Sequence, residues 1–195
     1  KDELETSALL VRGILIGLSA GLILILTQVP LFGAVLGLAP ASFEVESLAK
    51  EYLQIRVYSA PAAIALFGIT GWLIANERTR AVLVLMLLIN SINIVLDFVF
   101  VLRLGWGVEG VALATIVAEW IGLLFGLWLA KEGFKNGYWR NWSQIFDRSR
   151  LIKMAKVNSD ILIRSVLLEI AFVSFLFLGS SFDDATLAAN QVLIQ

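Results

Sequence analysis

The sequence predicts an all-α integral membrane protein, a bundle of membrane-spanning helices. Of its 195 residues, 59% are hydrophobic and 16% are charged, and the mean hydropathy is +0.86. A soluble domain of this size is nearer half apolar and a quarter charged. Five apolar stretches reach the roughly 20 residues that a helix needs to cross a bilayer. None of them shows the alternation of a membrane barrel strand.

The five predicted spans are joined by short connections, with one exception after the fourth span. The spans are Leu9–Leu31, Leu53–Ala75, Ala81–Val101, Val108–Ala130 and Asp160–Gly179. A sixth is expected to begin near Ala185 and is incomplete at Gln195. The incomplete sixth span and the absence of an initiating methionine predict a fragment from the middle of a larger transporter.

The long connection covers residues 131–158 and carries seven of the fifteen basic residues, interleaved with aromatic side chains. This pattern is typical of an amphipathic segment lying on the membrane surface. We therefore expect three parts: residues 1–130, the linker 131–158, and the start of a second half at 159–195.

Missing residue types and the charge balance exclude several function classes. The sequence has no cysteine and no histidine, so thiolate metal sites, cysteine nucleophiles, Ser-His-Asp triads and nearly all zinc catalysis are excluded. We expect no enzyme and no bound cofactor. The net charge of −1 gives no electrostatic footprint for nucleic acid.

The distribution of Lys and Arg predicts the orientation in the membrane. Counting connections alternately from the N-terminus, one side holds eleven basic residues and the other holds three, which are Lys50, Arg56 and Arg103. Arg164 lies inside the fifth span and is not counted. The positive-inside rule places the N-terminus and the linker in the cytoplasm.

Glycine and proline are expected to shape the bundle. Small residues four apart allow helix backbones to approach closely in lipid, and they occur at Gly13/Gly17/Gly21, Gly33/Gly37 and Gly122/Gly126. Pro30 and Pro61 invite kinks. Gly105–Gly110 fits a dinucleotide-binding pattern, but both flanks are membrane-length apolar runs, so a tight turn between two spans is the better interpretation.

Polar residues deep in the spans are the candidate functional residues, because each is costly in lipid unless paired. They are Asn90, Asn93, Asp97, Thr115, Glu119 and Glu169. If the third and fourth spans form a hairpin, Asp97 lies roughly 6 Å below its outer end, Thr115 roughly 10 Å and Asn93 roughly 12 Å. Asn90 and Glu119 both fall near roughly 16 Å.

Asn93, Asp97 and Thr115 thus offer an amide, a carboxylate and a hydroxyl at similar depth on two facing helices. Such a set suits a small hard cation such as Na⁺, or a proton held on a desolvated carboxylate. The alternative is that these side chains only form hydrogen bonds that hold the two helices together, and this is favoured for Asn90. Such a structural role does not require a charge, so a functional role is favoured for Asp97. Asn90, Glu119 and Glu169 are possible cavity-lining residues, and for Glu119 and Glu169 a functional role and a purely structural role are both open.

The sequence resembles the MATE (multidrug and toxic compound extrusion) family, and most closely its DinF-type branch. The resemblance rests on the order and spacing of several motifs: Thr27–Leu31 (TQVPL), Tyr52–Pro61, Asn90–Asp97 (NSINIVLD), Leu104–Thr115 (LGWGVEGVALAT) and Leu187–Gln191 (LAANQ). It implies a fold of twelve helices in two lobes. This chain would hold helices three to six, the inter-lobe linker, helix seven and the start of helix eight.

The same resemblance implies a function and a site. Archaeal and DinF-type members use an Asn and an Asp four apart on helix five and a Thr on helix six, which match Asn93, Asp97 and Thr115 here. The family's further Asp on helix one has no counterpart in this sequence. The implied activity is efflux of amphipathic, often cationic organic compounds in exchange for H⁺ or Na⁺, in a multi-pass protein of the bacterial inner (plasma) membrane. Its partners would be small organic substrates, the lipid bilayer and the remainder of the transporter.

Two alternatives remain at this point. A lipid-linked oligosaccharide flippase of the same superfamily would need a cationic cavity, whereas Arg164 is the one basic residue expected inside a span away from its ends. A membrane scaffold without transport activity would not need Asp97, Asn93 and Thr115 level with one another.

The predicted orientation can be tested by cysteine labelling, because the sequence has no cysteine of its own. A membrane-impermeant thiol reagent applied from the periplasm should modify Glu46→Cys and leave Arg78→Cys and Asn141→Cys unmodified. Permeabilised cells, in which all three should react, are the control. The reverse pattern would overturn the topology.

Overall fold

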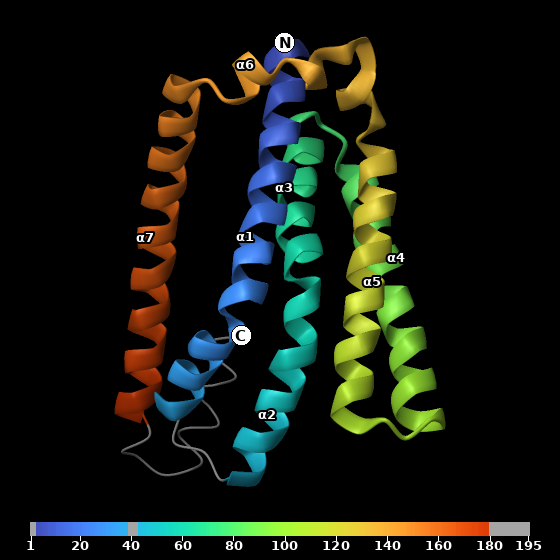
Figure 1. Ribbon diagram of the computed structural model, residues 1–195, viewed down its shortest axis with the longest axis vertical. Coiled ribbons are helices and arrows are strands. Elements are labelled where there is room, and N and C mark those ends of the chain that lie inside the picture. The colour runs from blue at the N-terminus through green and yellow to red at the C-terminus, as the bar shows by residue number, and fades with distance from the viewer. Residues whose placement is uncertain (1–2, 39–42, 180–195) are drawn as a thin grey trace. The chain divides into compact units, whose positions relative to one another are not determined.

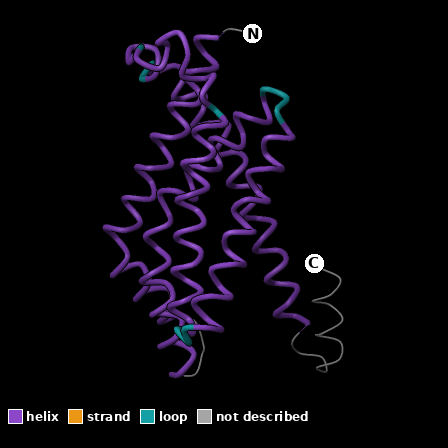
Figure 2. Tube along the Cα trace, turned by 90° about the vertical axis from the view of Figure 1, so that its right-hand side faces the viewer, coloured by secondary structure: helices purple, strands orange, loops and turns teal. Residues whose placement is uncertain are grey.

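The structure is a computed structural model that describes residues 3–38 and 43–179, and its regular elements in those ranges are all helical (Figures 1 and 2). This confirms the predicted fold class. The α-helices are α1 (Glu3–Leu38), α2 (Phe43–Arg56), α3 (Ala60–Ala75), α4 (Thr79–Asp97), α5 (Gly107–Leu129), α6 (Trp142–Ile145) and α7 (Arg148–Gly179). Between them lie the 3₁₀ helices η1 (Val57–Ser59) and η3 (Lys131–Arg140) and the π-helical segment η2 (Phe98–Arg103).

Four helical stretches in the described ranges are long and apolar enough to cross a membrane: Glu3–Ala34, Glu46–Ala75, Thr79–Arg103 and Gly107–Leu129. They correspond to the first four predicted spans. The fifth, Asp160–Gly179, lies within α7. The sixth, expected near Ala185, and the Leu187–Gln191 motif lie outside the described residues.

The second of these stretches is a helix with a local break. Helices α2 and α3 are joined through η1, and Pro61 stands at the start of α3. A proline at this position is tolerated, because the first N–H groups of a helix have no partner within it. The change in helix type is therefore placed where the sequence predicted a kink.

The chain divides into two compact units, residues 1–145 and 146–195, and the division falls inside the predicted linker. The first part of that linker packs on α1. The buried Arg12, 2% exposed, donates from Nε to the carbonyl of Ile145 at 2.7 Å and from Nη2 to the carbonyl of Gln144 at 2.5 Å. Ser7 Oγ donates to the carbonyl of Gly133 at 2.6 Å. These contacts explain why η3 and α6 belong to the first unit.

The interior of the first unit combines alanines with large apolar residues such as Leu10, Ile69 and Leu73, and many further large apolar side chains face outward. Ala62, Ala65, Ala112, Ala114 and Ala118 are fully buried. The large apolar side chains with the highest exposure, from 74% to 79%, are Leu26, Val29, Phe67 and Leu102. This distribution suits a lipid environment, in which helices associate by close backbone packing and outward-facing apolar groups are solvated by acyl chains.

The closest of these packings joins α1 to α3 along the predicted glycine stripe. A Cβ atom placed on Gly17 would stand 2.5 Å from the backbone nitrogen of Ala65, and one on Gly21 would overlap the backbone of Pro61. The missing side chains therefore set the distance between the two helices, as the spacing of glycines predicted.

The α4–α5 hairpin turns at glycines, which is how the Gly105–Gly110 pattern was interpreted. Gly105 and Gly107 have φ angles of 71° and 55°, in the left-handed region that glycine enters without steric cost. The stretch has no strand before it and opens a membrane-length helix, so it is a turn between spans.

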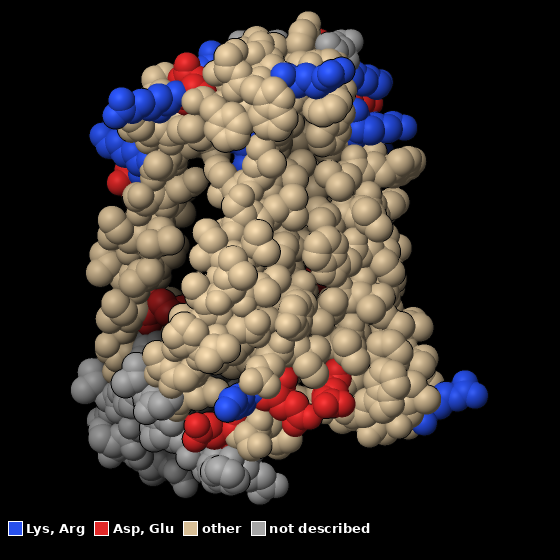
Figure 3. Space-filling view, in the orientation of Figure 1, with Lys and Arg blue, Asp and Glu red and all other residues tan. Residues whose placement is uncertain are grey.

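Charges in the first unit gather near the helix ends, as Figure 3 shows. Arg78 stands between α3 and α4, Arg80 stands in the first turn of α4, and Lys131, Lys135 and Arg140 stand in η3. We call this end the basic end. The opposite end, which holds Glu46, Glu51 and Glu109, carries much of the acidic charge.

We expect Gly17→Ala to destabilise the protein, because the new methyl group has only backbone atoms to displace at the α1–α3 contact. Overpacking of this kind costs about 1–3 kcal/mol. The matched control is Gly33→Ala in the same helix, where a Cβ meets nothing within 4 Å and the higher helix propensity of alanine should be neutral or stabilising. Thermal unfolding in detergent measures both, and a Gly17→Ala protein as stable as the Gly33→Ala protein would contradict the packing argument.

Candidate functional site

The hairpin of α4 and α5 brings two of the predicted site residues into contact. Asn93 Nδ2 donates a hydrogen bond to Thr115 Oγ1 at 3.3 Å, and Thr115 Oγ1 donates to the carbonyl of Val111 at 2.9 Å. Both side chains are half-buried. The hydroxyl therefore sits between its own helix and the neighbouring helix, and its second lone pair remains available to a cation.

Asp97 stands one turn further along α4, at the same helix face as Asn93 because the two are four residues apart. Its Oδ1 atom is buried and has no hydrogen-bond partner in the described part of the chain. A buried carboxylate oxygen without a partner is costly. Either a proton on the carboxyl group or a bound cation would remove that cost.

The helix changes type immediately after Asp97. Residues Phe98–Arg103 form a π-helical segment, and the N–H of Leu104 donates to the carbonyl of Val99 five residues earlier at 3.0 Å. Single π-helical turns inside α-helices are frequently found at functional sites, since the extra residue per turn redirects the neighbouring side chains. The sequence analysis did not anticipate this segment.

The donor set suits a small hard cation better than a transition metal. Asn93, Asp97 and Thr115 can supply amide, carboxylate and hydroxyl oxygens. No group of three or more His, Cys, Asp or Glu side chains that could hold a metal occurs among the described residues. One carboxylate with neutral oxygens matches the low charge of Na⁺, and the carboxylate alone suffices for a proton.

Glu119 forms an ion pair with Arg56, a residue that the sequence had placed in an outer connection. Arg56 Nη1 and Nη2 donate to the two carboxylate oxygens of Glu119 at 3.0 and 2.7 Å. Arg56 was counted with the outer connections because it stands near the start of the predicted span Leu53–Ala75, but the candidate span begins earlier, at Glu46. Arg56 therefore lies away from the span ends, and the expectation that Arg164 is the one basic residue in such a position is wrong. Ionisable residues inside membrane spans pair with one another, and Arg56 with Glu119 could have been sought on that ground.

The two remaining candidates are exposed side chains. Asn90 is exposed on α4. Glu169 is exposed on α7, which belongs to the second unit.

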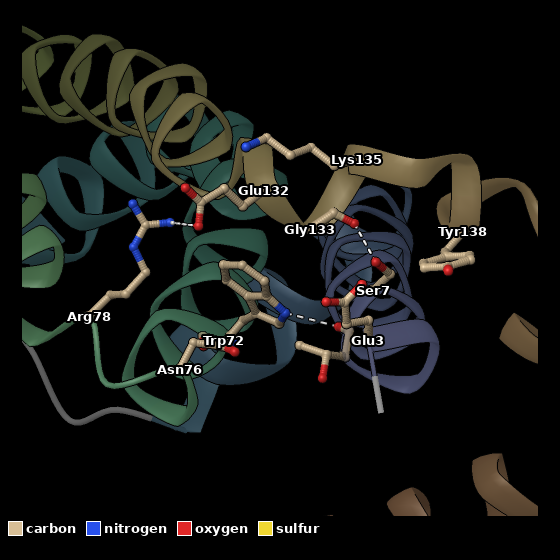
Figure 4. Close-up of a pocket in the computed structure, with 10 residues that line it drawn as sticks. Glu3, Ser7, Trp72, Asn76, Arg78, Glu132, Gly133, Lys135 and Tyr138 are labelled. Carbon is tan, nitrogen blue, oxygen red and sulfur yellow. Dashed lines mark hydrogen bonds and ion pairs between the residues drawn. The ribbon is translucent and has the colours of Figure 1, made fainter. Parts of the chain in front are cut away.

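A polar cavity of about 400 Å³ lies at the basic end. Arg78 pairs with Glu132 at 3.4 Å at its edge, and Trp72 Nε1 donates to the carbonyl of Thr6 at 2.9 Å (Figure 4). Asn93 stands 14 residues into α4 from that end, roughly 21 Å away along the helix. The cavity is therefore separate from the Asn93–Thr115 pair.

Comparison with known proteins identifies the family. The family model described as MatE matches residues 1–99. "DNA damage-inducible protein F" of Escherichia coli (strain K12) is 34% identical over 195 residues, which is all of this chain and 42% of that protein. The chain belongs to the MatE family. The resemblance to its DinF-type branch is confirmed, and the family is one of membrane transporters rather than enzymes.

Two plant MatE proteins match shorter regions. "Protein DETOXIFICATION 43" of Arabidopsis thaliana is 34% identical over 126 residues, 63% of this chain and 23% of that protein. "Protein DETOXIFICATION 44, chloroplastic" of the same plant is 30% identical over 84 residues, 43% of this chain and 16% of that protein. The chain thus spans less than half the length of these curated MatE relatives. No solved structure matches it significantly.

Proposed function

We propose that this MatE chain is part of a secondary transporter that expels amphipathic, often cationic organic compounds in exchange for H⁺ or Na⁺. Asp97 is the coupling carboxylate in the proposal, and Asn93 and Thr115 are its neutral partners. The observation that carries it is the buried Oδ1 atom of Asp97, which has no partner in the described residues although Asn93 and Thr115 are hydrogen-bonded to each other on the same hairpin.

The proposed coupling depends on a difference in binding between two states. An unoccupied Asp97 is a half-buried negative charge whose Oδ1 atom has no partner among the described residues, and taking up a proton or a sodium ion neutralises it. A ligand shifts a conformational equilibrium only by as much as it prefers one state over the other. A carboxylate in a low-dielectric site supplies such a preference, because the cost of its burial depends strongly on its charge.

Glu119 is unsuited to this coupling role. Both of its oxygens accept hydrogen bonds from Arg56, so its charge is already compensated. A proton or sodium ion arriving at Glu119 would have to displace a guanidinium group. Glu109, the other carboxylate of α5, is exposed in its first turn, so Asp97 is the carboxylate inside the α4–α5 hairpin that can respond to a gradient.

A second cavity supports the proposed substrate class. It has a volume of about 380 Å³ and lies between the second half of α1 and α2. Its lining combines Val29, Phe32 and Leu36 with the amides of Gln28 and Gln54, the carboxylate of Glu46 and the ammonium group of Lys50. Pockets for small organic molecules have this size and this mixture of apolar walls with a few polar groups.

The transport of lipid-linked oligosaccharides is less well supported, although Arg56 is a cation inside a span. A pyrophosphate group needs an unpaired positive charge, and Arg56 is paired with Glu119. We place the protein in a bacterial inner membrane with the basic end in the cytoplasm, on the strength of the Lys and Arg distribution.

Asp97→Asn should abolish ion-driven efflux when these residues form part of a complete transporter, since the amide keeps the size of the side chain and cannot change its charge. Thr115→Ala should weaken the response to the coupling ion about two- to tenfold, the range expected for one hydrogen-bonding group. The assay is efflux of a fluorescent organic cation from vesicles under an imposed H⁺ or Na⁺ gradient.

The matched control is Asp160→Asn, the same chemical change at an exposed position of α7, which should leave efflux unchanged. Normal efflux from an Asp97→Asn protein that accumulates normally would remove Asp97 from the mechanism.

A further inference from the structure

The ion pair between Arg56 and Glu119 lies deep within the helices of the first unit. Glu119 is 12 residues into α5, roughly 18 Å along a helix whose length is roughly 34 Å. Arg56 and Glu119 have side-chain exposures of 27% and 15%. The two terminal nitrogens of Arg56 each donate to a different carboxylate oxygen of Glu119, Nη1 to Oε2 at 3.0 Å and Nη2 to Oε1 at 2.7 Å. Such a fork fixes direction as well as distance.

The ion pair lies at the break between α2 and α3. Arg56 is the last residue of α2, and η1 follows it. Trp120, next to Glu119 in α5, donates from Nε1 to the carbonyl of Tyr58 at 3.2 Å, and Ser59 Oγ donates to the carbonyl of Arg56 at 2.8 Å. Two consecutive residues of α5 therefore hold the broken turn of the neighbouring helix.

The fork also fixes the rotation of α5 about its own axis. Glu119 and Thr115 are four residues apart and share a helix face. A helix rotates by about 100° per residue, so a change of one residue in register would turn both side chains away from their partners. An apolar contact would tolerate such a rotation, whereas a buried charge pair would leave two uncompensated charges and resists it.

We propose that Arg56 and Glu119 are positioning residues for the cation site. Their ion pair sets the rotation of α5 so that Thr115 meets Asn93 beside Asp97. The part of the inference that concerns cation use rests on the function proposed above, while the part that concerns the orientation of α5 stands independently of it.

The first test is Arg56→Lys, which keeps the positive charge and removes the fork. The concentration of H⁺ or Na⁺ that gives half-maximal efflux should rise about three- to tenfold, as expected when one charge-assisted hydrogen bond is lost. The maximal rate should stay within about a factor of two, because Asp97 is intact. The matched control is Arg80→Lys, the same change at an exposed arginine in the first turn of α4, which should change neither quantity.

The second test measures the orientation of α5 without any transport. In a sequence with no native cysteine, Asn93→Cys and Thr115→Cys introduce the only two thiols, at side chains that are in contact. Oxidation should join them in membranes that contain the otherwise unchanged protein. In the Arg56→Lys background the yield of this disulfide should fall at least about threefold, and in the Arg80→Lys background it should be unchanged.

If Arg56→Lys does not accumulate, the double variant Arg56→Gln/Glu119→Gln takes its place. It leaves two amides that can bond to each other and no uncompensated charge, and the same reduced disulfide yield and raised half-maximal concentration are expected. An unchanged yield or an unchanged half-maximal concentration in a variant that accumulates would overturn the proposal. If Asp97→Asn still couples efflux to the gradient, the proposed function has failed, and the disulfide yield alone then decides the role of the pair.

Discussion

The absence of water inside the bilayer is the constraint on which the rest of the structure depends. A polar group in hydrocarbon has to find its partner within the protein, and helices do this for the backbone. Polar side chains have no such regular pattern, and each needs a specific partner. In the first unit Arg56 pairs with Glu119, Asn93 with Thr115, and Arg12 with the carbonyls of Gln144 and Ile145. Two buried side-chain oxygens of the described residues have no partner, Thr70 Oγ1 and Asp97 Oδ1, and Asp97 is the one of these two residues that can carry a charge.

Close packing of backbones is the second requirement, and it explains the small residues of the interior. Lipid chains are as apolar as leucine, so burying a leucine between two membrane helices offers little advantage over leaving it in lipid. Gly17 and Gly21 instead bring α1 against α3 with no side chain between them. The remaining polar contacts then act on a frame whose distances are already fixed, which is what a site built from three different side chains requires.

Much of the fold could be predicted from the sequence, because hydropathy and glycine spacing are properties of single segments. The first four spans, the glycine contact and the turn at Gly105 are of this kind. The contact between Asn93 and Thr115 could also be predicted, because a short turn between two antiparallel helices fixes the depths of their residues relative to each other. Arg56 was misplaced because the start of its span was judged from hydropathy alone, and a charge that is neutralised by another helix lowers hydropathy without leaving the membrane. The π-helical segment after Asp97 depends on how the end of α4 joins the turn that follows it. No residue type in the sequence predicts such a segment.

The attachment of the linker to α1 divides the predicted linker between the two units. Arg12 holds the chain as far as Ile145. Further along, Asp147 Oδ1 accepts hydrogen bonds from Ser149 Oγ at 2.6 Å and from the backbone N–H of Arg150 at 3.0 Å, at the start of α7. Residues 131–145 are therefore an extension of the first unit that depends on α1 for its place, and they are not a free spacer. The sequence of a surface segment and the sequence of the helix that anchors it are in this way tied together, although they lie more than a hundred residues apart.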